Sequence, residues 1–208
     1  MGVDIWAMSK ARFVNCPGDE ENCSDDHCSV VAHRKSLDGR EEGCYVVGKG
    51  GREFSFRVGS YHDFDAWRKL LSIFALGVMP EEVWNHPGRY RKQSFFEIVD
   101  FPDSVGFAMG PKTAGKLYAD FAAHSAKARK FYRDPETPKE IASYLKGGRR
   151  PAKNLRNAGL FAEAKVAKTI DATVLEQTTE ELEWMWHVYR DFRRAFKLAS
   201  DGGLVTFC

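Results

Sequence analysis

The chain has 208 residues, of which 43% are hydrophobic and 13% aromatic, so it can build a core and disorder over most of its length is excluded. The net charge is only +2, but acids crowd residues 16–44 and bases crowd residues 139–168. No segment approaches 18 uninterrupted apolar residues, and the opening MGVDIWAMSKARF lacks the cleavage site of a signal peptide. We therefore expect a cytoplasmic protein without a membrane partner.

The first quarter of the sequence predicts strands around a long loop. Alternating polarity predicts a strand over residues 3–8, and residues 11–14 either continue that strand or return beside it. Residues 15–43 are polar, Cys-rich and without periodicity; a loop of this length in a compact domain is functional, metal-held or mobile. Residues 44–48 and 53–58 flank a Lys-Gly-Gly turn, which predicts a hairpin with one buried face.

The next segment predicts a helix, a loop and a buried strand. Asp63 can cap a helix that ends at Gly77. An apolar stripe runs along this helix: Phe64, Trp67, Leu70, Leu71 and Phe74. Residues 80–92 are predicted to form a loop with a basic end, and the apolar run at residues 95–101 is predicted to be a strand.

The second half is predicted to be mainly helical. Gly110-Pro111 opens a helix whose free N–H groups can hold an anion, although ordinary capping is the simpler interpretation. A capping box predicts a short helix over residues 137–148. The clearest periodicity covers residues 179–200, and residues 204–207 are predicted to form a last strand.

Strands at the start, middle and end of the chain, with helices between them, predict an α+β fold. We expect a mostly antiparallel sheet with helices packed on one face. The length favours a single domain over residues 1–208, with a Cys-rich polar loop at about 15–43 and a basic loop at about 146–156.

Four stretches carry a resemblance to known proteins: MGVDIWA, FRVGSYHDFDAWRKLL, IVDFPDSVGFAMGPKTAGKLYADF and WHVYRDFRRAFKLASDGGLVTF. Together they resemble a family of bacterial and phage proteins to which no function is assigned. The resemblance spans most of the chain, apart from the Cys-rich loop and the basic segment. It implies one domain and no particular catalytic residue, cofactor or substrate.

The Cys-rich loop gathers side chains that can bind a metal. Thiolates and imidazoles are the ligands that Zn²⁺ prefers, and four of them make a closed structural site. The cysteine spacings lack a C-x2-C pair, so reduced thiols without metal are an open alternative, whereas disulfides are disfavoured in the cytoplasm. The candidate ligands are Cys16, Cys23, Cys28, His27, His33 and Cys44.

The basic segment at residues 146–156 carries five positive charges and no acid. Lysine and arginine neutralise phosphates by displacing counterions, so this segment suggests nucleic-acid binding. Arg149, Arg150 and Lys153 are expected to contribute most. A solvated loop that binds nothing is the alternative, because Gly-Gly and Pro disfavour regular structure.

Three hypotheses of function stay open. The first is a binding or inhibitory protein that acts by protein–protein contact, by analogy with phage proteins that block a defence complex. The second is a small enzyme with a site near Tyr61, His62 and Asp103, where element ends meet. The third is a metal-stabilised nucleic-acid-binding protein. No catalytic constellation stands out, which favours the first hypothesis. The partner and the oligomeric state cannot be predicted from these patterns.

Overall fold

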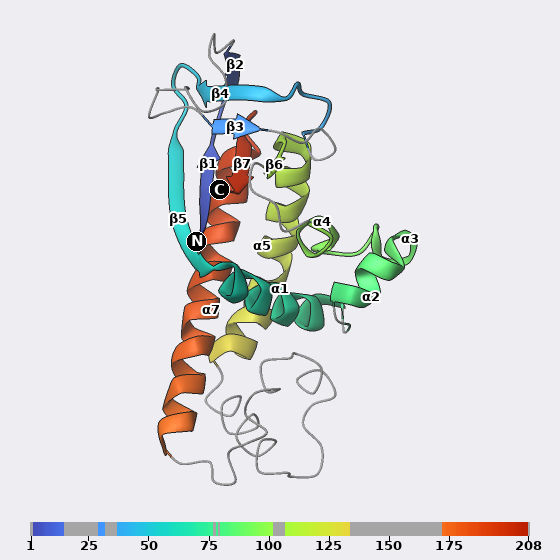
Figure 1. Cartoon of the computed structure of the whole chain (residues 1–208), viewed down its shortest axis with the longest axis vertical. Coiled ribbons are helices and arrows are strands. Elements are labelled where there is room, and N and C mark those ends of the chain that lie inside the picture. The colour runs from blue at the N-terminus through green and yellow to red at the C-terminus, as the bar shows by residue number, and fades with distance from the viewer. Residues whose placement is uncertain are drawn as a thin grey trace. The chain divides into compact units, whose positions relative to one another are not determined.

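The computed structural model describes residues 2–14, 29–31, 37–76, 78, 80–101, 107–133 and 172–207 (Figure 1). The chain divides into two compact units. Unit 1 contains residues 1–61, 102–120 and 191–208, and unit 2 contains residues 62–101 and 121–190. The fold is α+β, as predicted, and the described strand pairs are all antiparallel.

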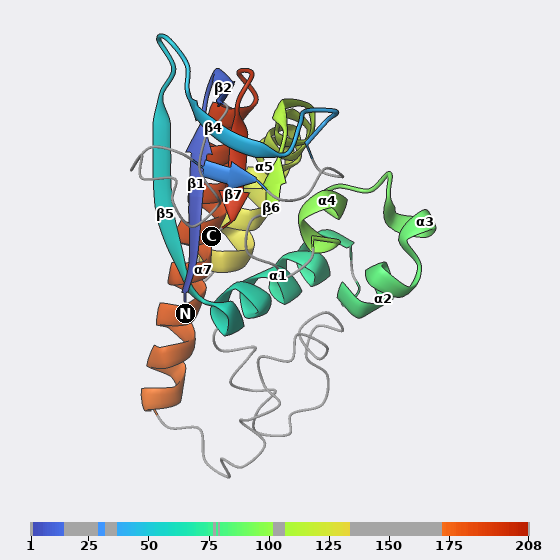
Figure 2. The ribbon, with the colours of Figure 1, turned by 45° about the horizontal axis from the view of Figure 1, so that its top comes forward.

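Unit 1 is organised around a four-stranded sheet, sheet A, in the order β5-β1-β7-β6. The strands are β1 (Gly2–Met8), β5 (Glu53–Ser60), β6 (Phe107–Met109) and β7 (Leu204–Phe207). Figure 2 shows β5 as an outer strand, next to β1. Three of these four strands were predicted from alternation or from a terminal apolar run; β6, with only three residues, was missed.

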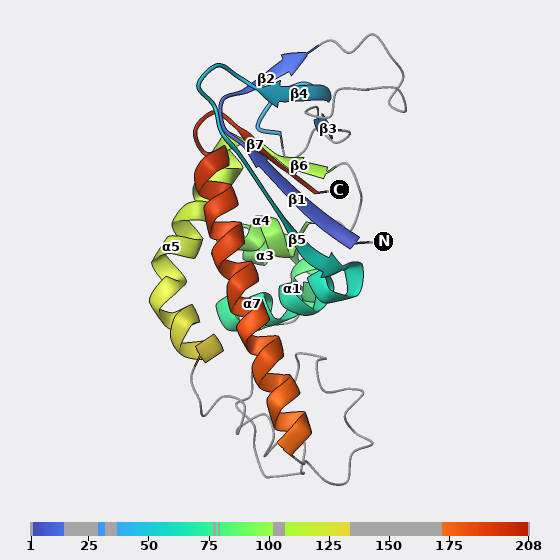
Figure 3. The same cartoon turned by 90° about the vertical axis from the view of Figure 1, so that its left-hand side faces the viewer.

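One face of sheet A is covered by the end of α7 (Ala172–Ala199), together with the start of α5 (Pro111–Arg133) (Figure 3). Side chains of one face alternate along each strand, so β5 turns Phe56 and β7 turns Phe207 toward the helices. Phe192 of α7 is fully buried between them, with ring centroids 5.1 Å from Phe56 and 6.1 Å from Phe207. The prediction that the last helix packs on the sheet is confirmed.

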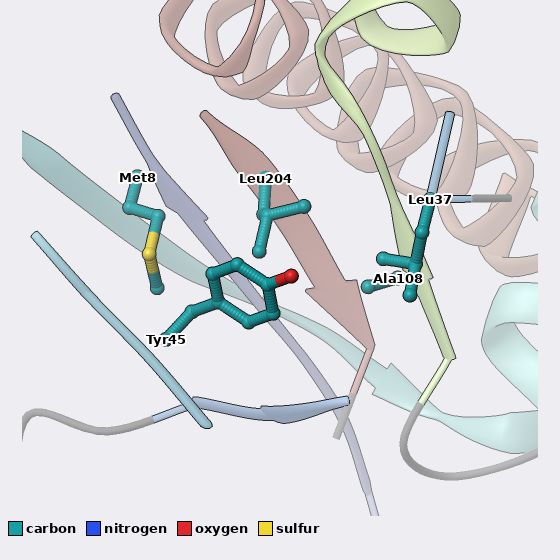
Figure 4. Close-up of a cluster of buried hydrophobic side chains, with 5 residues drawn as sticks. All are labelled: Met8, Leu37, Tyr45, Ala108 and Leu204. Atoms are coloured by element: carbon teal, nitrogen blue, oxygen red, sulfur yellow. The ribbon is translucent and has the colours of Figure 1, made fainter. Parts of the chain in front are cut away.

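A second sheet, sheet B, contains β2 (Ala11–Val14), β4 (Gly43–Val47) and β3 (Ser29–Val31) in the order β2-β4-β3. Figure 4 shows side chains of sheet B and sheet A pointing toward one another in a small core. The members of this core are Met8, Leu37, Tyr45, Ala108 and Leu204. Sheet B therefore packs on the face of sheet A opposite the helices.

The predicted hairpin between residues 44–48 and 53–58 is wrong. β4 pairs with β2 and β3, whereas β5 pairs with β1 in the other sheet. Between them, Gly48 donates to the Lys10 carbonyl and Gly51 donates to Gly48, which turns the chain from one sheet into the other. Alternation identified which face of each strand is buried, but it carries no information about the neighbouring strand.

Unit 2 is helical. It contains α1 (Tyr61–Leu76) from residue 62 onward, α2 (Pro80–Asn85), α3 (Pro87–Tyr90) and α4 (Phe96–Val99), with the later part of α5 and the earlier part of α7. Its core is aromatic: Phe121 lies 4.8 Å from Phe95 and 4.7 Å from Tyr189 between ring centroids. The Tyr189 hydroxyl donates to the Phe121 carbonyl at 2.8 Å.

Two further predictions in this region are wrong. The apolar run at residues 95–101 contains the short helix α4, and Phe95, the first residue of the run, adopts φ 64° directly before that helix. Residues 80–92 contain α2 and α3, not only a loop. Short apolar runs fit buried strands and buried helices equally well. The helix predicted over residues 137–148 lies outside the described residues. None of the described helices is both long and apolar enough to cross a membrane.

Candidate partner-binding groove on unit 1

A groove of 390 Å³ lies between the start of β5 and the end of α7 in unit 1. The strand contributes an aromatic floor, and successive turns of the helix contribute charged side chains along one wall. Its lining residues are Arg52, Glu53, Phe54, Arg194, Lys197, Leu198 and Asp201. The groove therefore joins segments that lie about 140 positions apart in the sequence, from Arg52 to Arg194.

Two of the three cations of the groove lie over aromatic rings. The Arg194 guanidinium carbon lies 4.0 Å from the centroid of the Phe54 ring, and Lys197 Nζ lies 6.0 Å from that of Tyr118. Within the described part of the chain, no salt bridge joins Arg52, Arg194 or Lys197 to an acid. Three cations against the two acids of the lining leave the groove able to attract an anion.

The first two residues of β5 line this groove, and the outer edge of the strand is open within the described part of the chain. Ser9 N–H donates to the Arg52 carbonyl at 2.9 Å, and Arg52 N–H donates to Ser9 Oγ at 2.8 Å, so the backbone of Arg52 faces β1. Backbone direction alternates along an antiparallel strand, so Glu53, Ser55 and Arg57 turn their N–H and C=O groups away from β1. Among the described residues, these outward groups have no hydrogen-bond partner.

The composition of the groove suits the binding of an anion. Its described lining residues provide three cations and an aromatic ring and include no serine, cysteine or histidine. Guanidinium and ammonium groups supply charge-assisted hydrogen bonds, and Phe54 supplies apolar contact. These groups together can hold a carboxylate that is flanked by apolar atoms.

A second hollow, of 290 Å³, lies beside sheet B. Its arginine is already used, because Arg40 donates to the carbonyls of Ala11 at 3.2 Å and Gly202 at 2.9 Å. Burial raises the pKa of Tyr45; Arg40 lowers it and Glu41 raises it, and the net pKa lies above the ordinary value. Because the Arg40 guanidinium already donates to backbone carbonyls, it is less available to bind an anion than the cations of the β5–α7 groove.

The start of α5 already holds an anion, which is a side chain of this protein. Asp38 Oδ2 accepts from the N–H groups of Lys112 and Thr113 at 2.6 and 3.0 Å, and Asp38 Oδ1 accepts from Thr113 Oγ1 at 2.8 Å. A Cβ on Gly110 would lie 2.6 Å from Asp38 Oδ2, so the approach requires glycine. The capping interpretation of Gly110-Pro111 is confirmed, with a cap 74 positions away from Lys112.

The residues predicted for an enzyme site are only partly described. Tyr61 and His62 are the first two residues of α1; Tyr61 is half-buried and His62 is exposed. Asp103 lies outside the described residues. The predicted grouping of these three side chains therefore stays a prediction.

The predicted metal and nucleic-acid residues fall mostly outside the described part of the chain. Cys44 is buried on β4, opposite Val14 and Val30 in the sheet register. Among the described residues, no group of three potential metal ligands is found. The other candidates, Cys16, Cys23, Cys28, His27, His33, Arg149, Arg150 and Lys153, lie outside the described residues. The zinc and nucleic-acid hypotheses stay predictions.

The groove cations could not be predicted from a run of bases without acids, because Asp191 lies among the bases of their helix. A signal was present: Arg194 and Lys197 are three positions apart and fall off the apolar stripe of their helix. A second missed feature is a pair of acids in unit 2. Burial raises the pKa of Glu181, and repulsion from Asp63 raises it further. Only the fold brings these two carboxyl groups near one another.

No family model, curated protein or solved structure matches this chain.

Proposed function

We propose that this chain is a binding protein whose unit 1 holds an acidic segment of a partner protein in the β5–α7 groove. The observation that carries the proposal is the set of three groove cations that form no salt bridge within the described part of the chain. Arg194 and Lys197 are exposed and lie over aromatic rings, so their N–H groups are available to a carboxylate of a partner.

The mixed lining favours an acidic peptide over a nucleic acid. Glu53 and Asp201 stand among the cations and would repel a continuous row of phosphates. An acidic peptide places single carboxylates between apolar side chains, which matches Arg194 and Lys197 beside Phe54 and Leu198. The proposal agrees with the first sequence hypothesis, of action by protein–protein contact.

The test uses a fluorescein-labelled peptide of alternating glutamate and valine, with a lysine–valine peptide and a single-stranded dT20 oligonucleotide as comparison probes. Fluorescence anisotropy is measured at low salt for the natural chain and for the double variant Arg194→Ala/Lys197→Ala. Losing two charge-assisted contacts should weaken binding of the acidic peptide about tenfold or more. The lysine–valine peptide should not bind.

The matched control is Lys112→Ala/Arg129→Ala, which removes two exposed cations from α5 outside the groove. This control should bind the acidic peptide as the natural chain does. If both double variants lost the same affinity for the acidic peptide, the effect would be explained by net charge alone and the proposal would be wrong. Absence of peptide binding at low salt would also overturn the proposal. Tighter binding of dT20, with a steep loss as salt rises, would favour the nucleic-acid hypothesis instead.

A further inference from the structure

The open edge of β5 has a charge pattern that is complementary to itself. The first five of its eight residues, Glu53, Phe54, Ser55, Phe56 and Arg57, place an acid at one end, a base at the other and a small polar residue in the centre. The two phenylalanines occupy equivalent positions on either side of the centre. An antiparallel copy of the same strand, centred on Ser55, would set Glu53 opposite Arg57 at both ends.

From this pattern and the open edge we infer that two copies of the chain associate through β5, with a two-fold axis at Ser55. The inference does not depend on the acidic-peptide proposal.

The backbone supports this register. Antiparallel pairing requires outward-facing residues of one strand to meet outward-facing residues of the other. Glu53, Ser55 and Arg57 all turn their N–H and C=O groups to the open edge, so the register centred on Ser55 matches them at every pair. Each such pair exchanges two hydrogen bonds, which makes about six across the axis. A shift of one residue would match outward groups with inward ones.

The side chains support the same register. Glu53, Ser55 and Arg57 are exposed on one face of the strand, whereas Phe54 and Phe56 are half-buried on the helical face. Pairing would place each exposed acid beside an exposed base and each half-buried phenylalanine beside its counterpart, 54 against 56. Phe54 and Phe56 already stack within one chain, with ring centroids 5.7 Å apart. The second copy would extend this aromatic row.

Such an interface is isologous, because each copy uses the same surface patch. The two four-stranded sheets would become one continuous eight-stranded sheet. The axis is perpendicular to the sheet, so both helical faces lie on one side and the two grooves open in the same direction. Edge pairing over five residues is a small interface, and we expect a Kd on the order of 10–100 µM.

The test exploits the symmetry of the charges. Glu53→Arg puts two arginines of one copy opposite two of the other, and Arg57→Glu does the same with glutamates. Each single reversal should therefore weaken self-association about tenfold or more, because two attractive pairs become repulsive. The double variant Glu53→Arg/Arg57→Glu should associate like the natural chain. An equimolar mixture of the two single variants should form a heterodimer, since each supplies the charge that the other lacks.

Sedimentation equilibrium from about 5 to 500 µM spans the expected Kd and measures each case, with one variant labelled to detect the heterodimer. Arg129→Glu, an exposed reversal outside the edge, is the matched control and should leave association unchanged. Ser55→Pro removes an outward N–H but none of the bonds to β1, so it should abolish association while thermal unfolding stays cooperative.

The inference is overturned if the natural chain stays monomeric over the whole concentration range. It is also overturned if Glu53→Arg and Arg57→Glu each associate as strongly as the natural chain. The peptide measurement compares Arg194→Ala/Lys197→Ala with the natural chain and leaves the β5 edge unchanged, whereas Glu53→Arg also adds a cation to the groove. The two proposals are therefore tested by different variants and can fail separately.

Discussion

Arg68 in unit 2 and Arg194 in unit 1 both lie over aromatic rings, yet the two side chains are used in opposite ways. Arg68 is fully buried, with its guanidinium carbon 5.5 Å from the Phe64 ring centroid and 5.1 Å from that of Trp84. It donates to the Phe101 carbonyl at 2.6 Å and to Asp65 Oδ1 at 3.1 Å. Arg194 is exposed and, among the residues that the structure describes, lies over the ring of Phe54 alone.

The comparison shows that an aromatic contact alone does not decide what an arginine does. A buried guanidinium whose N–H groups bind backbone and carboxylate oxygens is part of the fold, because removing it would leave those acceptors buried without a donor. An exposed guanidinium over a ring is held in place while its N–H groups still face solvent. The first should matter for stability and the second for recognition.

The sharpest stability contrast is expected between Phe192 and Arg194, which lie two positions apart on α7. Phe192→Ala should lower the free energy of unfolding by about 3–5 kcal/mol, because it removes a fully buried ring from the sheet–helix core. Arg194→Ala should change it by less than about 0.5 kcal/mol, as for other exposed positions. Urea unfolding of both variants measures the difference. Equal effects would contradict the assignment of Arg194 to recognition.

Arg68→Ala should destabilise the protein by about 3 kcal/mol, near the lower end for a broken buried ion pair. The lower end is expected because Asp65 keeps its contact with Lys69, at 2.6 Å between Oδ2 and Nζ. Urea unfolding again provides the measurement, and Arg68→Lys should recover only part of the loss because lysine lacks the planar fork. If Arg68→Ala left the free energy of unfolding unchanged, the proposed contrast between Arg68 and Arg194 would be contradicted.

Asp38→Ala should lower the free energy of unfolding by about 1 kcal/mol, the usual effect of removing a side-chain cap from a helix. Asp38→Asn should cost less, because an amide oxygen can still accept from the N–H groups of Lys112 and Thr113, and asparagine tolerates the positive φ of 58° at this position. Thermal unfolding compares the two. If both variants lost the same stability, hydrogen bonding would not explain the cap.

The smallest effect concerns Asp65 and pH. Burial raises the pKa of Asp65, but hydrogen bonds and attraction from Lys69 and Arg68 outweigh it, so the net pKa lies below the ordinary value of 3.8. The folded state therefore gains stability from this group above pH 3.8 and loses it as the pH falls through the lower, folded pKa. Urea unfolding should show Asp65→Asn destabilised at pH 6 and approaching the natural chain near pH 3. A difference that stays constant with pH would contradict this assignment.

Local periodicity predicted the elements but not their neighbours. The stripes on α1 and α7 and the alternation of β1 and β5 each follow from one segment, and these elements were correctly predicted. The hairpin failed because β5 has the same alternation whether it pairs with β4 or with β1. Phe95, Ile98 and Val99 are buried, as an apolar run predicts, but seven residues are too few to separate a strand from a helical turn.

The candidate groove illustrates the same limit for function. Phe54 comes from β5 and Arg52 directly precedes that strand, while Arg194 and Lys197 come from a helix that begins more than a hundred positions later. The bases of α7 at residues 190–197 are as dense as those at residues 146–156, but only the fold brings Arg194 and Lys197 next to Phe54 of β5. The self-complementary order of charges from Glu53 to Arg57 is visible in the sequence. It suggests self-association only because β5 lies at the edge of sheet A, where a second strand could pair with it.

The position of β7 in sheet A has a consequence for how the protein is made. β7 lies between β1 and β6, and Ile5 pairs with Phe207, 202 positions later in the chain. A ribosome releases β1 long before its partner exists, so the centre of the sheet cannot close during synthesis of the preceding residues. Closing so long a loop before its contacts form is slow. One side of β1 must therefore stay unpaired with other strands until β7 has been synthesised.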